Sequence, residues 1–154
     1  MSDEEIKIHR GLNNVYFDRT KTTYINGKEG ILEYRGYNIH DLAEKSSFEE
    51  VSYLLLYGKL PTKNELDAFN SSLKESREIP SQVIDIIKSI KDSHPMDVLR
   101  TAVSALSAFD EEASDKSYDA TMRKGIRLTS QVPTIVMAHN SIRNGKDPVD
   151  PSKE

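Results

Sequence analysis

The stretch SFEEVSYLLLYGKLPTKNEL, residues 47–66, carries two successive signals for the start of a helix. Ser47 is followed three residues later by Glu50, and Thr62 is followed three residues later by Glu65. In this spacing, known as a capping box, each side chain bonds a backbone N–H group that the first turn of a helix leaves without a partner. The stretch therefore predicts two helices in succession and points to a mainly helical protein.

Downstream of this stretch, apolar residues recur at helical spacing. The pattern predicts a first helix that ends at Gly58, a second after Thr62, a third begun by Pro80, and two more over residues 95–109 and 118–143. The candidate core positions on these helices are Val51, Leu54, Leu55, Leu66, Phe69, Leu73, Val83, Ile84, Ile87, Ile90, Met96, Leu99, Ala102, Val103, Leu106 and Phe109.

The last of these helices contains two residues that disfavour helix. We expect it to be interrupted at Gly125 and kinked at Pro133, because proline has no N–H group to donate. Residues 110–117, which precede it, are interpreted as a charged linker.

Upstream of residue 47 the pattern changes from helix to strand. Residues 15–17 and 20–25 are rich in β-branched and aromatic residues, and residues 31–34 repeat this composition after Asn26-Gly27. Asn-Gly readily supplies the two positive-φ positions of a type I′ turn, so we expect a small β-hairpin. Asn38 or Asp41 then begins a short helix that runs to about residue 45.

The predicted fold class is mainly α, with one small N-terminal β-hairpin. Residues 1–13 are expected to form a flexible N-terminal arm, and residues 14–154 a single multi-helical unit.

Composition excludes several classes of function. The net charge of −4, with basic and acidic residues interspersed, argues against a nucleic-acid partner. The longest apolar run, residues 53–57, is far shorter than the roughly 20 residues that span a bilayer, and the acidic N-terminus does not resemble a secretory signal. There is no cysteine, hence no disulfide or thiolate metal site. We expect a cytoplasmic protein with no membrane partner.

The chemistry-bearing residues form no recognisable site. None of the four histidines, His9, His40, His94 and His139, has another four residues away to share a metal ion. His94, before a proline, is interpreted as a capping or packing residue rather than a base. His139 is expected to be exposed or to lie at a contact between helices.

Three acidic clusters could be read as paired catalytic carboxylates, but each lies in an arm, a first helical turn or a linker. Residues 3–5, 49–50 and 110–112 are therefore interpreted as solvated surface. The aromatic and basic group at residues 34–37 is assigned a structural role at the end of the hairpin. From the residues alone we predict no catalytic, cofactor-binding or metal-binding residue.

Three blocks carry a family resemblance. Residues 26–42 (NGKEGILEYRGYNIHDL), 47–66 and 94–106 (HPMDVLRTAVSAL) resemble successive blocks of citrate synthases and 2-methylcitrate synthases. The resemblance runs in order from Gly11 to Pro151 and implies the N-terminal part of that family's multi-helical large domain.

The resemblance implies an acyl-CoA condensing enzyme. The family joins an acyl-CoA, usually acetyl-CoA, to oxaloacetate and releases citrate and free CoA, a step of the tricarboxylic acid cycle. An aspartate removes a proton from the acyl group, two histidines act at the carbonyl groups, and arginines hold the carboxylates.

The family's catalytic motifs have no counterpart here, so the resemblance transfers no catalytic residue. His9-Arg10-Gly11 only superficially resembles the family's Gly-His-Arg segment. We expect an inactive N-terminal fragment whose helices at 95–109 and 118–143 form the surface of a homodimer or bind a full-length synthase subunit. The alternatives are a 2-methylcitrate synthase that uses propionyl-CoA and a naturally short, non-catalytic dimerisation or regulatory module.

Overall fold

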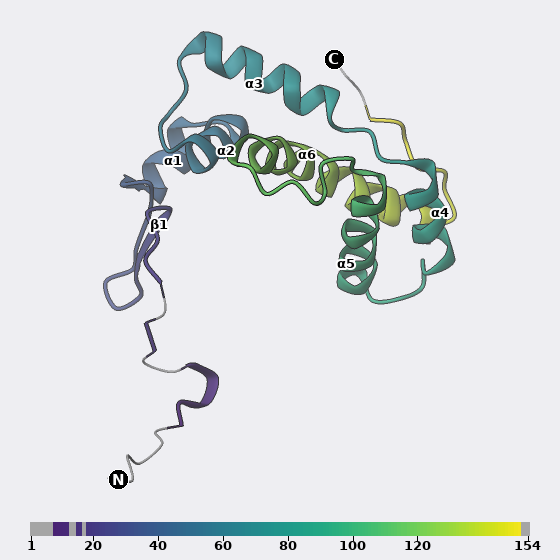
Figure 1. Ribbon diagram of the computed structural model, residues 1–154, viewed down its shortest axis with the longest axis horizontal. Helices are drawn as coiled ribbons and strands as arrows, with labels where there is room; N and C mark the ends of the chain where they lie inside the picture. The colour runs from purple at the N-terminus through teal and green to yellow at the C-terminus, as the bar shows by residue number, and fades with distance from the viewer. Residues whose placement is uncertain (1–7, 13–14, 17, 152–154) are drawn as a thin grey trace.

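The computed structural model describes residues 8–12, 15–16 and 18–151 (Figure 1). Six α-helices follow a three-stranded antiparallel sheet in the order β1-β2-β3. In chain order the elements are η1 (Arg10–Leu12), β1 (Thr23–Asn26), β2 (Ile31–Tyr34), β3 (Tyr37–Asn38), α1 (Ile39–Lys45), α2 (Phe48–Tyr57), α3 (Lys63–Glu75), α4 (Ser81–Ser89), α5 (Pro95–Leu106), η2 (Ser107–Phe109) and α6 (Tyr118–Arg143).

The predicted hairpin is confirmed, but its turn is of another type. Asn26 pairs with Ile31, so four residues form the loop, and Gly30 (φ 68°) is the loop's residue with positive φ. The Asn26 side chain accepts hydrogen bonds from the N–H groups of Lys28 and Glu29 at 3.2 and 3.3 Å. This side-chain bonding replaces the type I′ geometry expected from Asn-Gly. The sequence pattern also missed the short strand β3.

The N-terminal predictions fall partly outside the described residues. Most of the predicted arm, residues 1–7 and 13, lies there, as does Phe17 of the strand-like segment 15–17. The described part of the arm contains one 3₁₀ turn, η1. Val15 and Tyr16 lie outside the strands.

The helix starts follow the predicted caps. Asn38, rather than Asp41, caps α1 by accepting from the N–H of His40. Both capping boxes form in full at α2 and α3, and α2 ends at Gly58 in the left-handed conformation. These predictions are confirmed because each cap involves only the residues of one helical turn.

The predicted interruption of the last helix at Gly125 is wrong. Helix α6 is continuous from Tyr118 to Arg143 and includes Pro133. A Cβ atom on Gly125 would lie 3.3 Å from Cδ2 of Leu56, so glycine here lets α6 approach α2 closely. The predicted kink at Pro133 remains a prediction.

The core consists of two apolar clusters joined by α6. Figure 1 shows α6 running through the middle of the helices, with α1–α3 toward its start and α4 and α5 toward its end. One cluster joins Tyr53, Phe69 and Leu73 to the half-buried Ile126 of α6. The larger cluster joins α4, α5 and α6 through Val83, Ile87, Val98, Ala102, Leu106, Ile135 and Ile142.

Two predicted core residues are exposed. Met96 is 63% exposed and Phe109 is 44% exposed, whereas Val98, which the pattern did not select, is fully buried. The buried stripe of α5 runs through Val98, Ala102 and Leu106 at intervals of four, so Met96 lies on another side of the helix. Phe109 follows the end of α5, where the tighter 3₁₀ turn η2 rotates it away from that stripe.

Candidate functional site

Two of the histidines, His94 and His139, hydrogen-bond to main-chain groups. His94 caps α5: its Nδ1 accepts a hydrogen bond from the N–H of Met96 at 3.2 Å, which confirms the capping interpretation. His139 is buried, with its Nε2 atom 3.0 Å from the carbonyl oxygen of Lys91, so it lies at a contact between α6 and the segment after α4. Among the described residues, no group of three or more His, Asp or Glu side chains could hold a metal ion.

The aromatic and basic group at residues 34–37 joins the sheet to the helices. Arg35 has a φ of 52°, and its Nη2 atom donates to the carbonyl oxygen of Leu55 at 2.9 Å. A guanidinium group is favoured at this carboxyl end of α2, where helical carbonyl groups lack partners. The contact agrees with the structural role expected for this group.

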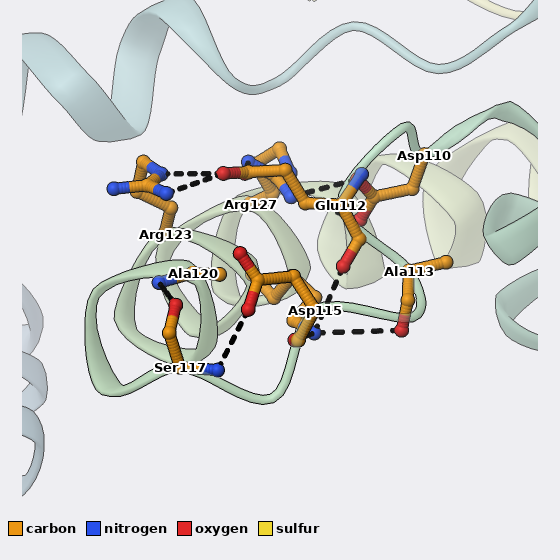
Figure 2. Close-up of polar contacts among 9 residues, drawn as sticks. Asp110, Glu112, Ala113, Asp115, Ser117, Ala120, Arg123 and Arg127 are labelled. Carbon is orange, nitrogen blue, oxygen red and sulfur yellow. Dashed lines mark hydrogen bonds and ion pairs between the residues drawn. The ribbon is translucent and has the colours of Figure 1, made fainter.

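The acidic cluster at residues 110–112 differs from the expected solvated surface. Asp110 and Glu112 turn toward α6, where both carboxylates contact Arg127 (Figure 2). Arg127 donates to both oxygens of Asp110 at 2.9 and 2.8 Å and to Glu112 at 2.9 Å. Arg123 donates to the other oxygen of Glu112. The side chains of Asp110, Glu112 and Arg127 are only 23–30% exposed, so solvent screens these ion pairs incompletely.

The rest of the loop is held by hydrogen bonds between side chains and main-chain groups. Asp115 accepts a hydrogen bond from the N–H of Ser117 at 2.8 Å, and Ser117 in turn caps α6 by accepting from the N–H of Ala120. Lys124 donates to three main-chain carbonyl groups of residues 112–115. We call residues 110–117 the acidic loop. It connects η2, at the end of α5, to the start of α6.

A cavity of about 490 Å³ lies behind the acidic loop. Its apolar lining residues include Pro80, Val103, Leu106, Phe109 and Leu128, and its charged lining residues include Asp110, Glu112, Lys124 and Arg127. The two cations of this lining, Lys124 and Arg127, already bond to carbonyl groups or carboxylates of the acidic loop.

The carboxylates in the lining of the cavity are poorly suited to acid–base chemistry near neutral pH. Hydrogen bonds from Arg123 and Arg127 lower the pKa of Glu112 to about 2, and Arg127 also lowers the pKa of Asp110. A general base works best when its pKa lies near the working pH. These carboxylates therefore serve the structure of the loop.

The ion pairs predict how stability depends on pH. The folded chain binds fewer protons at Asp110 and Glu112 than the unfolded chain, because their pKa values are lowered on folding. Their stabilising effect is therefore present above the ordinary pKa values of 3.8 and 4.5, and it is lost as the pH falls through the lowered pKa values, of which that of Glu112 is about 2.

Substitution of Arg127 by methionine is expected to lower the free energy of unfolding by about 2 kcal/mol at pH 7, between the values typical of surface and buried pairs. It should also weaken the loss of stability between pH 4.5 and pH 2. Urea unfolding across this pH range measures both effects. Arg100→Met is the matched control, since Arg100 has an exposed ion pair with Asp97. Equal pH dependence in the wild type and Arg127→Met would contradict the assignment.

Sequence reasoning missed this network because its members lie far apart along the chain. Arg127 is 17 residues from Asp110 and 15 from Glu112. The one available signal is the spacing of Arg123 and Arg127, which places two cations on one side of a helix.

The last two helices also expose large apolar side chains. On α5, η2 and α6 these residues are Met96, Phe109, Tyr118, Leu128, Val136 and Met137. In the described part of the chain, no helix is both long and apolar enough to cross a membrane.

These features define a helix-rich fold with a small antiparallel sheet, and sequence comparison places it in a family. The family model described as "Citrate synthase, C-terminal domain" matches residues 11–154. The chain therefore belongs to the citrate synthase family.

Two curated relatives illustrate the similarity. The citrate synthase of Deinococcus radiodurans is 46% identical over 145 residues, which are 94% of this chain and 38% of the relative. The 2-methylcitrate synthase 1 of Corynebacterium glutamicum is 38% identical over 152 residues, which are 98% of this chain and 39% of the relative. The chain thus spans about two fifths of the length of these relatives.

Solved structures show the same fold. The crystal structure of citrate synthase from Pyrobaculum aerophilum superposes with a TM-score of 0.90 at 37% identity, over 95% of this chain and 39% of that one. A citrate synthase from Thermoplasma acidophilum, solved as a ternary complex with carboxymethyl coenzyme A and oxaloacetate, superposes with a TM-score of 0.80 at 28% identity, over 95% and 39% of the two chains.

Proposed function

We propose that this chain is the N-terminal scaffold of a citrate synthase-type enzyme that condenses acetyl-CoA with oxaloacetate to form citrate and CoA. The observation that carries the proposal is the continuous match of residues 11–154 to the family. The Thermoplasma relative, which was solved with oxaloacetate and a coenzyme A derivative, supports the choice of substrates.

In this proposal the catalytic groups come from polypeptide outside residues 1–154. The chain covers 38–39% of the relatives compared above, and the family's catalytic motifs do not occur in it. The described part contributes a scaffold and, through α5 and α6, a surface for a second subunit. The exposed apolar side chains of these two helices support that role.

The first test is the coding sequence beyond the codon for Glu154. The proposal requires the reading frame to continue through a Gly-His-Arg segment and a later aspartate. The 154-residue chain should release no free thiol from acetyl-CoA in the presence of oxaloacetate, whereas the longer product should do so. Turnover by the short chain would refute the assignment of catalysis to polypeptide beyond it.

The same experiments test two alternatives. The Corynebacterium relative favours a 2-methylcitrate synthase, which the longer product would reveal by a higher kcat/KM with propionyl-CoA than with acetyl-CoA. A stop codon directly after Glu154 would instead favour a short, non-catalytic module that binds a full-length synthase. Co-purification with such a synthase would support the module, and a stable, monodisperse monomer would count against it.

A further inference from the structure

The turn at residues 112–115 gathers three main-chain carbonyl groups around one cation. The Nζ atom of Lys124 lies 3.1 Å from the carbonyl oxygen of Glu112, 3.5 Å from that of Ala113 and 2.5 Å from that of Asp115. All three acceptors belong to the acidic loop, whereas Lys124 lies on α6.

The number of acceptors matches the number of donors. A lysine ammonium group has three N–H donors and no acceptor, so each donor has one carbonyl oxygen within reach, the longest contact being the 3.5 Å to Ala113. The neighbouring carboxylates have other partners: that of Glu112 binds Arg123 and Arg127, and that of Asp115 accepts from the N–H of Ser117. The ammonium group is therefore held by backbone oxygens, which are also the atoms that replace the hydration shell of potassium in selective channels.

Within the described part of the chain, donors other than Lys124 fill little of the acceptor capacity of these oxygens, and because residues 113–115 are exposed, water is the competing partner. The carbonyl group of Glu112 also accepts from the N–H of Asp115 at 3.0 Å, which closes the turn, but one N–H donor leaves most of the acceptor capacity of the three carbonyl groups unused. A cation at this place takes the position of water at these oxygens. It also joins the acidic loop to α6 and so helps to fix the wall of the cavity behind it.

We propose that residues 112–115 form a binding site for one monovalent cation or primary ammonium ion, and that the chain fills this site with its own Lys124. Lys124 is thus a positioning residue for the acidic loop. The planar guanidinium group of an arginine would fit three convergent oxygens less well than the tetrahedral ammonium group. This inference does not depend on the proposed enzymatic function.

The test is to remove the side-chain cation and to supply a free one. Lys124→Met is expected to lower the thermal unfolding midpoint by about 4 °C and to speed amide hydrogen exchange in residues 110–117. Ammonium or potassium chloride at about 0.2 M should reverse at least half of both effects, relative to the same ionic strength of tetramethylammonium chloride. Lys124→Arg should remain destabilised in all three salts.

The wild type and Lys28→Met serve as controls, because Lys28 is exposed at the hairpin loop and lies far from the acidic loop along the chain. In both, the three salts should shift the midpoint equally. If Lys124→Met is unfolded in tetramethylammonium chloride, ammonium chloride should restore its helical circular dichroism. An equal response of Lys124→Met to all three salts, or an unchanged midpoint, would overturn the proposal.

Discussion

Replacing Ile87 by alanine is expected to lower the free energy of unfolding by about 3–4 kcal/mol. Ile87 lies on α4 and is fully buried in the larger cluster, between α5 and α6. Truncation removes the transfer free energy of its buried carbon atoms and leaves a cavity that the surrounding helices fill only in part. A loss of this size is a large share of the 5–15 kcal/mol that stabilises a typical domain.

Urea unfolding followed by circular dichroism measures the loss, and two further variants give its scale. Ile87→Val removes one methyl group and should cost about 1 kcal/mol. Ile25→Ala makes the same change as the first variant at a side chain that is 70% exposed in the sheet, and it should cost less than about 1 kcal/mol. Similar losses for Ile87→Ala and Ile25→Ala would show that the cluster around α4 is not a cooperative core.

The fold could be predicted from the sequence wherever the deciding interactions are local. Asn38, Ser47, Thr62 and His94 all start helices in the structure, since a cap requires only residues two or three positions away. The resemblance to citrate synthases, carried by three blocks in order, supplied the family and the helical class, and the comparisons confirm both.

Predictions failed where the partner lies far along the chain. Gly125 was expected to interrupt a helix, but its role depends on the approach of Leu56, some 70 residues earlier. Met96 was assigned to the core because helical periodicity leaves open which of several apolar sides a helix buries. Likewise, Asp110 and Glu112 resemble solvated linker residues until α6 brings Arg127 beside them.

The candidate site could be predicted from the sequence even less well than the fold, because its partners also lie far apart along the chain. The sequence marked residues 110–117 as a charged linker, but neither the resemblance nor residue spacing indicated that this segment folds against α6 through Arg123, Lys124 and Arg127. Three carbonyl groups around Lys124 cannot be inferred from residue types at all, because every residue has a carbonyl group and only the fold decides where it points.

The second large effect concerns association of the chain with itself. Replacing both Val136 and Met137 by lysine is expected to weaken self-association by at least about 100-fold. These neighbours on α6 are 47% and 61% exposed, and a large exposed apolar surface normally marks a contact with another molecule. Two charges placed in such a contact must be removed from water without a partner, which costs several kcal/mol and corresponds to a 100-fold or larger change in affinity.

The measurement is light scattering coupled to size-exclusion chromatography over a range of concentrations. It distinguishes the proposed interface from nonspecific association. The control replaces Tyr24 and Ile25 of β1 by lysine, which removes two exposed apolar side chains, 55% and 70% exposed, from a different part of the molecule. If α5 and α6 form the subunit surface, only the α6 variant shifts the chain to monomer, and circular dichroism remains that of the wild type. If both pairs weaken association equally, the contact is nonspecific and the role proposed for α6 is wrong. If neither does, the exposed side chains of α6 do not mediate self-association, and the role proposed for α6 is wrong as well.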